Sequence, residues 1–148
     1  MIFKHILVPV DFSDGSVNAL RLAVSMGRAS GAKLTLLHVG VVPHVYDTEL
    51  SIVGVGPSVF LDLSGQIATE HKHRLERLIA SDVPSEMTTV AIVREGYAPD
   101  EILDVIKEVH PDLVVMGTHG RTGLARALLG SVAERVIRQA EVPVLVTR

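Results

Sequence analysis

The residue types best suited to chemistry in this 148-residue chain lie in a glycine-rich segment between Gly117 and Ser131. Two residues separate Gly117 from Gly120, and nine separate Gly120 from Gly130. Glycine lets the backbone approach an anion closely, and the free N–H groups at the start of a helix point toward a bound phosphate. A helix is expected to open at Ser131, whose hydroxyl lies at the same place. The segment therefore predicts a phosphate-binding loop.

Two short apolar runs, residues 113–116 and 142–146, enclose this segment. A continuously apolar run rich in β-branched residues is typical of a parallel strand buried on both faces. The order is therefore strand, glycine loop, helix and strand. This order places the loop at the carboxyl end of a buried strand, where phosphate groups bind.

The rest of the chain repeats the same alternation of apolar runs with amphipathic segments. Gly31 and Pro111 are expected to end two of the helices. The alternation predicts a single doubly wound α/β domain, Rossmann-like, with a five-stranded parallel sheet and helices on both faces. The other expected strands cover residues 6–10, 34–39 and 87–94, and the other expected helices cover 14–30, about 59 or 64 to 80, and 99–109.

The glycine pattern G-x2-G-x9-G-[ST] resembles the nucleotide-binding signature of the universal stress protein family, in its ATP-binding branch. The opening residues 4–13 and the segment 36–39 also match that family's pattern. The resemblance covers the whole chain, so residues 1–148 are expected to form one nucleotide-binding domain. It implies the strand order 3-2-1-4-5, which the alternation alone does not specify.

In such a sheet, ligands bind beyond the carboxyl ends of the strands where the strand order reverses. With the implied order, this switch point lies between the first and fourth strands. The resemblance implies ATP as ligand, with Mg²⁺ as an optional companion. The residues implied to bind the nucleotide are Pro9, Val10, Asp11, Val39, Met116, Gly117, His119, Gly120, Arg121, Gly130, Ser131 and Val132.

Ser131 and Asp11, the two main polar candidates for ligand binding, could each have a structural role instead. Ser131 followed by Glu134 fits a capping box, which stabilises a helix without any ligand. Asp11 could cap the helix that follows the first strand, although Ser13 could take that place. In the family pattern, the acidic residue matching Asp11 lies beside the ribose and adenine.

Other charged or titratable residues carry weaker predictions. Arg121 is a plausible counter-charge for phosphates, while His119 is expected to contribute its backbone. His71 and His73 stand two positions apart on a predicted helix. Their side chains should point to different faces, so a shared metal ion is not expected.

Composition excludes several classes of protein. A net charge of −3 and 3% aromatic residues argue against nucleic-acid binding, which uses basic patches and aromatic stacking platforms. The lack of cysteine excludes disulfides and thiolate zinc sites. No apolar stretch approaches the roughly 20 residues of a membrane span, and no signal peptide is visible. We therefore expect a cytoplasmic protein without membrane insertion.

The function expected from the resemblance is an adenine-nucleotide-binding regulatory or stress-response protein that acts on an unidentified partner protein. Two alternatives remain open, a slow ATP hydrolase and a dimeric interaction module without ligand. A homodimer is expected through the C-terminal strand, residues 142–147, because an exposed apolar sheet edge is a template for pairing. Residues 41 to about 57 are expected to form a mobile loop over the ligand.

Overall fold

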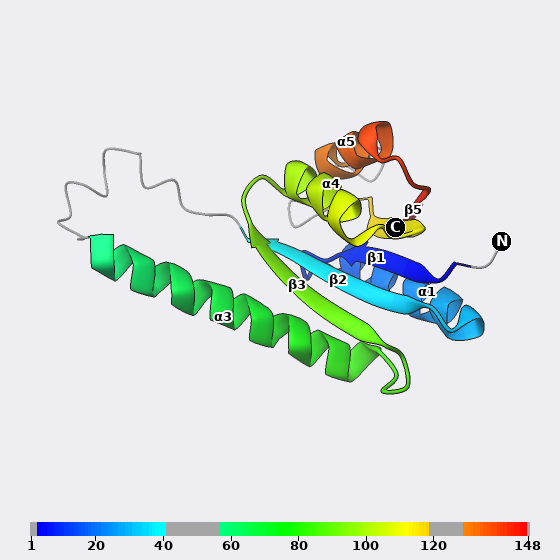
Figure 1. Ribbon diagram of the computed structural model, residues 1–148, viewed down its shortest axis with the longest axis horizontal. Helices are drawn as coiled ribbons and strands as arrows, with labels where there is room; N and C mark the ends of the chain where they lie inside the picture. Colours follow the sequence, from blue (N-terminus) through cyan, green and yellow to red (C-terminus); the bar gives the residue numbers. More distant parts are fainter. Residues whose placement is uncertain (1–2, 41–56, 119–128, 148) are drawn as a thin grey trace.

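The computed structural model describes residues 3–40, 57–118 and 129–147, with the backbone alone for residues 57–64. All the predicted strands and helices are present, but β3 and β5 each begin two residues later than predicted. The expected loop from residue 41 lies almost entirely outside the described residues. The elements, shown in Figure 1, are β1 (His5–Pro9), α1 (Asp14–Ser30), β2 (Lys33–Gly40), α3 (Pro57–Asp82), β3 (Thr89–Glu95), α4 (Ala98–Val109), β4 (Leu113–Gly117), α5 (Ser131–Gln139) and β5 (Val144–Thr147).

The strands form one five-stranded parallel sheet in the order β3-β2-β1-β4-β5, which confirms the predicted fold class and strand order. Leu7 of β1 pairs with Thr35 of β2 on one side and with Val114 of β4 on the other. The chain thus adds strands first on one side of β1 and then on the other. The carboxyl ends of β1 and β4 are neighbours at this switch point.

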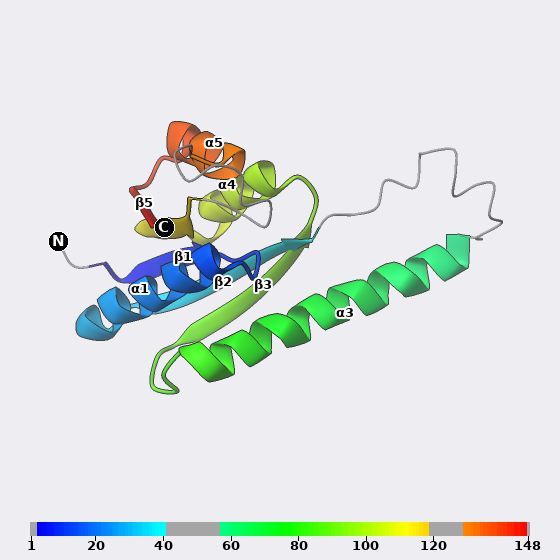
Figure 2. The ribbon, with the colours of Figure 1, turned by 180° about the vertical axis from the view of Figure 1, so that it is seen from behind.

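Helices cover both faces of the sheet, and each face has its own apolar core. Alternate residues of β1 point to opposite faces, so that Ile6 and Val8 pack on the side of α1 and α3, while Leu7 packs on the side of α4 and α5. Figures 1 and 2 show these two helical layers from opposite sides. Burial on both faces explains why the strands are continuously apolar.

The buried face of α1 agrees only in part with the predicted one. The sequence pattern predicts a stripe of Val17, Leu20, Val24 and Gly27. Leu20 and Gly27 are buried, but Val17 and Val24 are only half-buried. The other buried residues of α1 are small, namely Ser16, Ala19 and Ala23. Small side chains let α1 lie close against the sheet. Its predicted C-cap is confirmed, because Gly31 takes the left-handed conformation at φ 67°.

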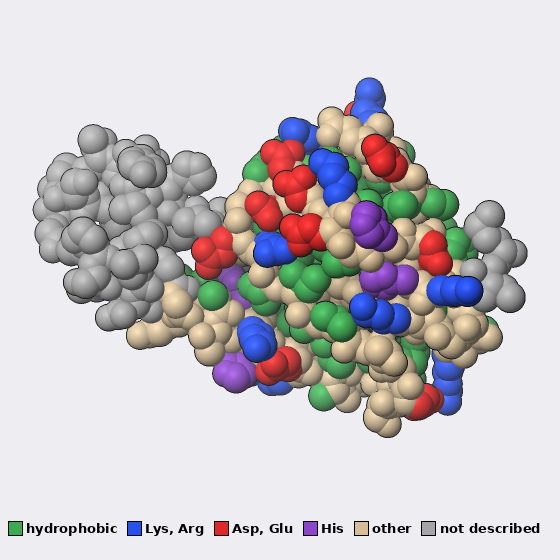
Figure 3. Space-filling view, in the orientation of Figure 1, with side chains coloured by type: hydrophobic (Ala, Val, Ile, Leu, Met, Phe, Trp, Pro, Cys, Tyr) green, Lys and Arg blue, Asp and Glu red, His purple; other side chains and the backbone are tan. Residues whose placement is uncertain are grey.

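Acidic and basic side chains are interspersed over α4 on the face shown in Figure 3. Among them, Lys107 pairs with Asp104 and Arg94 pairs with Glu108. Within the described part of the chain, no helix is long and apolar enough to cross a membrane.

Candidate functional site

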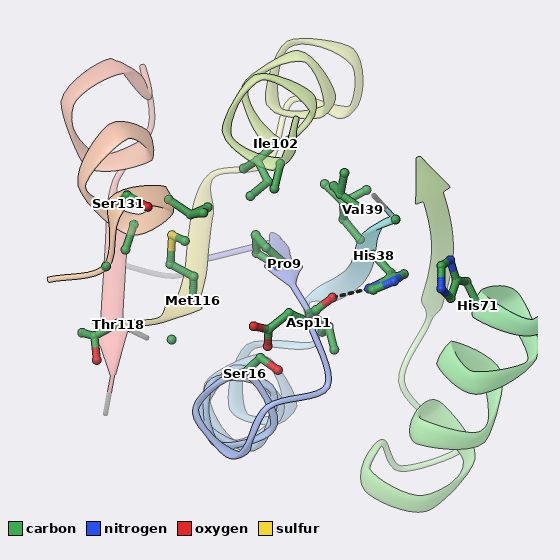
Figure 4. A pocket seen from close by; sticks show the side chains of 18 of the residues that line it. Pro9, Asp11, Ser16, His38, Val39, His71, Ile102, Met116, Thr118 and Ser131 are labelled. Carbon is green, nitrogen blue, oxygen red and sulfur yellow. Dashed lines mark hydrogen bonds between the residues drawn. The ribbon is translucent and has the colours of Figure 1, made fainter. Parts of the chain in front are cut away.

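A cavity of about 500 Å³ opens at the carboxyl ends of β1 and β4, the place predicted from the strand order (Figure 4). The structure brings most of the predicted site residues together around it. His119, Gly120 and Arg121 lie outside the described residues. The predicted residues that line the cavity are Pro9, Val10, Asp11, Val39, Met116, Gly117, Gly130, Ser131 and Val132.

One end of the cavity is formed by the start of α5. The Gly130 N–H donates to the Thr118 carbonyl at 2.8 Å, and the Thr118 N–H donates to the Thr147 carbonyl at 2.9 Å. These bonds fix the helix start beside the end of β4. Since the first N–H groups of an α-helix have no acceptor within the helix, this end of the cavity is suited to an anion.

The predicted capping box at this helix is wrong. Gly130, not Ser131, is the N-cap, and Ser131 is the first helical residue. A glycine cap has no side chain to accept a bond from the helix, and Glu134 instead pairs with Arg138 at 2.8 Å. The Ser131 side chain is exposed and lies at the cavity lining. Its hydroxyl therefore lies at the cavity and does not cap the helix.

Gly117 is required for a different reason from the predicted one. A Cβ atom at this position would lie 2.9 Å from the carbonyl carbon of Gly15 and 3.1 Å from the Ser16 nitrogen. The space beside Gly117 is therefore occupied by the first turn of α1, not left for a phosphate oxygen. Glycine here lets α1 pack against the end of β4, which holds the Asp11–Ser16 segment at the cavity.

Asp11 lies between the ends of the cavity, directly after β1 (Figure 4). Its carboxylate accepts from the Ser13 N–H at 3.0 Å and from the Ser13 hydroxyl at 2.5 Å. Burial opposes ionisation, but hydrogen bonds from Ser13 and Ser16 outweigh it, so the pKa of Asp11 is lowered. Ser13, which accepts from the Ser16 N–H, is the N-cap of α1. Asp11 is therefore a charged residue of the cavity and not the cap itself.

The other end of the cavity is largely apolar. Val39 and Gly40 lie at the end of β2, Ile102 comes from α4, and Ile67 comes from α3. An apolar slot next to a carboxylate can hold an aromatic heterocycle.

Two histidines at this end were not among the predicted site residues. His38 is buried, and its Nδ1 donates to the Val10 carbonyl at 2.7 Å. His71 of α3 lines the cavity, whereas His73 is exposed and lies 3.4 Å from Glu76. The two α3 histidines thus point to different faces, as predicted. Sequence spacing gave no signal for His71, because helical periodicity does not reveal which strand end a residue will reach.

No metal centre is apparent from the side chains alone. Among residues 3–40, 57–118 and 129–147, no group of three or more His, Cys, Asp or Glu side chains could hold a metal ion. The described part of the cavity combines anion-binding backbone, one ionised carboxylate and an apolar slot. This combination is suited to binding a nucleotide.

Comparison with known proteins agrees with this geometry. The model of the universal stress protein family matches residues 2–148. The chain is 33% identical to the universal stress protein MJ0531 of Methanocaldococcus jannaschii over 99% of this chain and 83% of that protein. It is 32% identical to the universal stress protein YxiE of Bacillus subtilis over 99% of both chains.

Solved structures share the fold. The structure of MJ0577, a universal stress protein of M. jannaschii, has a TM-score of 0.81 at 28% identity and covers 99% of this chain and 96% of that one. A universal stress protein from Archaeoglobus fulgidus, solved in complex with dAMP, has a TM-score of 0.59 at 26% identity, with both chains fully covered. With the family match along nearly its whole length, this chain belongs to the universal stress protein family.

Proposed function

We propose that this chain binds an adenine nucleotide, ATP in the first instance, in the cavity between the ends of β1 and β4. The single observation that carries the proposal is that one cavity joins the start of α5, the ionised Asp11 and an apolar slot. The dAMP complex of the A. fulgidus relative supports the choice of an adenine nucleotide. We treat residues 1–148 as one nucleotide-binding domain, since the family match covers 2–148.

The proposed pose follows the chemistry of the cavity. The phosphates accept hydrogen bonds from the first N–H groups of α5 and from the Ser131 hydroxyl. Asp11 accepts from the ribose hydroxyls, and the base lies in the slot beside Val39 and Ile102. His119, Gly120 and Arg121 complete the phosphate loop in this proposal, with Arg121 as counter-charge.

Mg²⁺ enters this proposal together with the triphosphate. Mg²⁺ is commonly held by one or two carboxylates and by substrate phosphates, with water completing its shell. Asp11, the carboxylate that lines the described part of the cavity, lies at the ribose in this pose, so the phosphates and water would supply most of the ligands of the ion. When bound, the ion neutralises phosphate charge.

Binding fits the cavity better than hydrolysis does. ATP hydrolysis needs a residue that orients the attacking water. In the proposed pose the Asp11 carboxylate, the ionised side chain that lines the described part of the cavity, lies at the ribose and away from the phosphates. We therefore propose a regulatory role through the bound state and an unidentified partner protein, rather than a dedicated enzyme.

The test is the release of ligand from purified protein. Denatured protein is extracted, and the extract is searched for adenine nucleotides by mass spectrometry. Emptied protein is then titrated with ATP and with CTP by calorimetry. We expect an adenine nucleotide in the extract and tighter binding of ATP than of CTP. Absence of binding to either would refute the proposal, and product formation in a single-turnover assay would favour the hydrolase.

We also propose a homodimer through β5. This strand is the last in the sheet order, and each of its residues is only half-buried. Antiparallel pairing with the same strand of a second copy would extend the sheet across its outer edge with two-fold symmetry. Deleting residues 142–148 should give monomer or aggregate. An unchanged dimer mass by light scattering would refute this interface.

A further inference from the structure

Three rings in contact border the apolar end of the cavity and join the segment after β1 to β2 and α3. The ring centroids of Phe12 and His38 lie 4.6 Å apart, and those of His38 and His71 are also 4.6 Å apart, with an angle of 74° between the two imidazole planes. The Arg74 guanidinium lies 4.1 Å from the Phe12 ring centroid. Because the Val10 carbonyl holds His38 in place, the edge-to-face contact with His38 positions the His71 ring (Figure 4).

His71 approaches the end of β2 unusually closely. A Cβ atom at Gly40 would lie 2.9 Å from His71 Nδ1 and 3.0 Å from Cε1. Any side chain at position 40 would therefore displace the imidazole from the cavity wall. Glycine at this position allows a ring from α3 to rest directly on the end of β2.

The Nδ1 atom of His71 is buried and has no hydrogen-bond partner in the described structure. Buried polar atoms nearly always have a partner, so such an atom carries a free-energy cost. The other titratable side chains that line the described cavity, Asp11 and His38, already have partners in Ser13 and the Val10 carbonyl. His71 is therefore the residue at this end that gains most from a polar ligand group.

We propose that His71 determines which base the cavity accepts, by hydrogen bonding to a polar substituent on the edge of a purine. This inference rests on the proposed nucleotide binding and assigns one of its specificity-determining residues. A neutral imidazole has one donor and one acceptor nitrogen, so it can accept from the amino group at C6 of adenine. The amino group would meet His71 at the end of β2, beside Gly40, where the imidazole lines the cavity.

The experiment compares ATP with purine riboside triphosphate, which has the same ring and phosphates but no substituent at C6. His71→Phe keeps an aromatic ring against His38 and removes both nitrogens. His71→Gln restores one donor and one acceptor. His73→Phe is the matched control, because His73 lies on the same helix with its side chain exposed. Affinities are measured by calorimetry, and folding is monitored by thermal melting.

Wild type and the control variant should prefer ATP over the analogue by roughly three- to tenfold, the range of one neutral hydrogen bond. His71→Phe should reduce this preference to about one, because it weakens the binding of ATP and not that of the analogue. His71→Gln should recover part of the preference. An unchanged preference in His71→Phe would overturn the role of His71 while leaving nucleotide binding intact. Failure of wild type to bind either ligand would instead refute the proposed function.

A measurement on wild type covers the case in which the Phe variant does not fold. The ring nitrogens of ¹⁵N-labelled histidine are followed by NMR during titration, with the His71 signals assigned from the Gln variant. We expect the His71 nitrogens to shift with ATP and to shift much less with the analogue. Equal shifts with both ligands would overturn the inference.

Discussion

Replacing Ser131 by alanine separates a ligand-binding role from a capping role at the start of α5. The structure places this serine at the first helical position, after the Gly130 cap. A capping serine changed to alanine costs about 1 kcal/mol of stability. Ser131 is not the cap, so we expect the free energy of unfolding of Ser131→Ala to stay within about 0.5 kcal/mol of wild type.

The effect of Ser131→Ala on ligand affinity should be larger than its effect on stability. It should be confined to ligands that carry phosphates. A hydrogen bond to a charged group contributes roughly 1.5–3 kcal/mol, and the low end applies here because the Ser131 side chain is exposed. About 1.5 kcal/mol corresponds to a loss of ATP affinity of roughly tenfold. Adenosine lacks the phosphates, so its affinity should not change.

The assay is calorimetric titration of ATP and adenosine, with urea unfolding measured without ligand. Ser25→Ala is a suitable control, because Ser25 is an exposed helical serine on α1, away from the cavity lining. A folded Ser131→Ala variant with wild-type affinity for ATP would refute the phosphate assignment. A loss of about 1 kcal/mol in unfolding free energy would refute the placement of the cap at Gly130.

Three further predictions concern the same region and the opposite end of the sheet. Asp11→Asn should weaken the binding of ATP and of adenosine by similar factors in calorimetric titrations, because it removes the negative charge beside the nucleoside half of the ligand. A loss of affinity for ATP alone would contradict this. Gly117→Ala should destabilise the fold by about 1–3 kcal/mol in urea, since its methyl group meets the Gly15 backbone; wild-type stability would contradict the close packing. Burial, and then the nearby Lys33 charge, lower the pKa of His5 from 6.5, so the unfolded chain binds this proton first as pH falls. Stability should therefore decrease below about pH 6.5, and His5→Gln should show a weaker decrease in thermal melting between pH 7.5 and 5.5.

The layered fold was predictable because it depends on local patterns. Apolar β-branched runs such as 113–116 identify buried strands without knowledge of their neighbours. Gly31 identified the end of α1 for the same reason, since a left-handed cap is a local property. The order of the strands is not local, and it came from the family resemblance of the glycine pattern.

The details of the site were less predictable because they depend on contacts between distant segments. The requirement for Gly117 comes from the first turn of α1, which no spacing within the glycine loop indicates. His71 reaches the end of β2 only because Gly40 leaves room for its ring. The error at Ser131 has another origin. The Ser-x-x-Glu pattern is satisfied in the sequence, but the helix begins one residue too early for that serine to cap it.

The contacts around Asp11 connect ligand binding to folding. The Asp11 carboxylate accepts from the Ser13 hydroxyl, and the Ser13 oxygen accepts from the N–H of Ser16 at 3.3 Å. The first turn of α1, which contains Gly15 and Ser16, is the one that packs against Gly117. The Asp11 carboxylate, which would accept hydrogen bonds from the ribose, thus also orients the N-cap of α1 and the end of β4. Substitution of Asp11 should therefore change stability as well as affinity, whereas Ser131 lies outside these contacts and should change affinity alone.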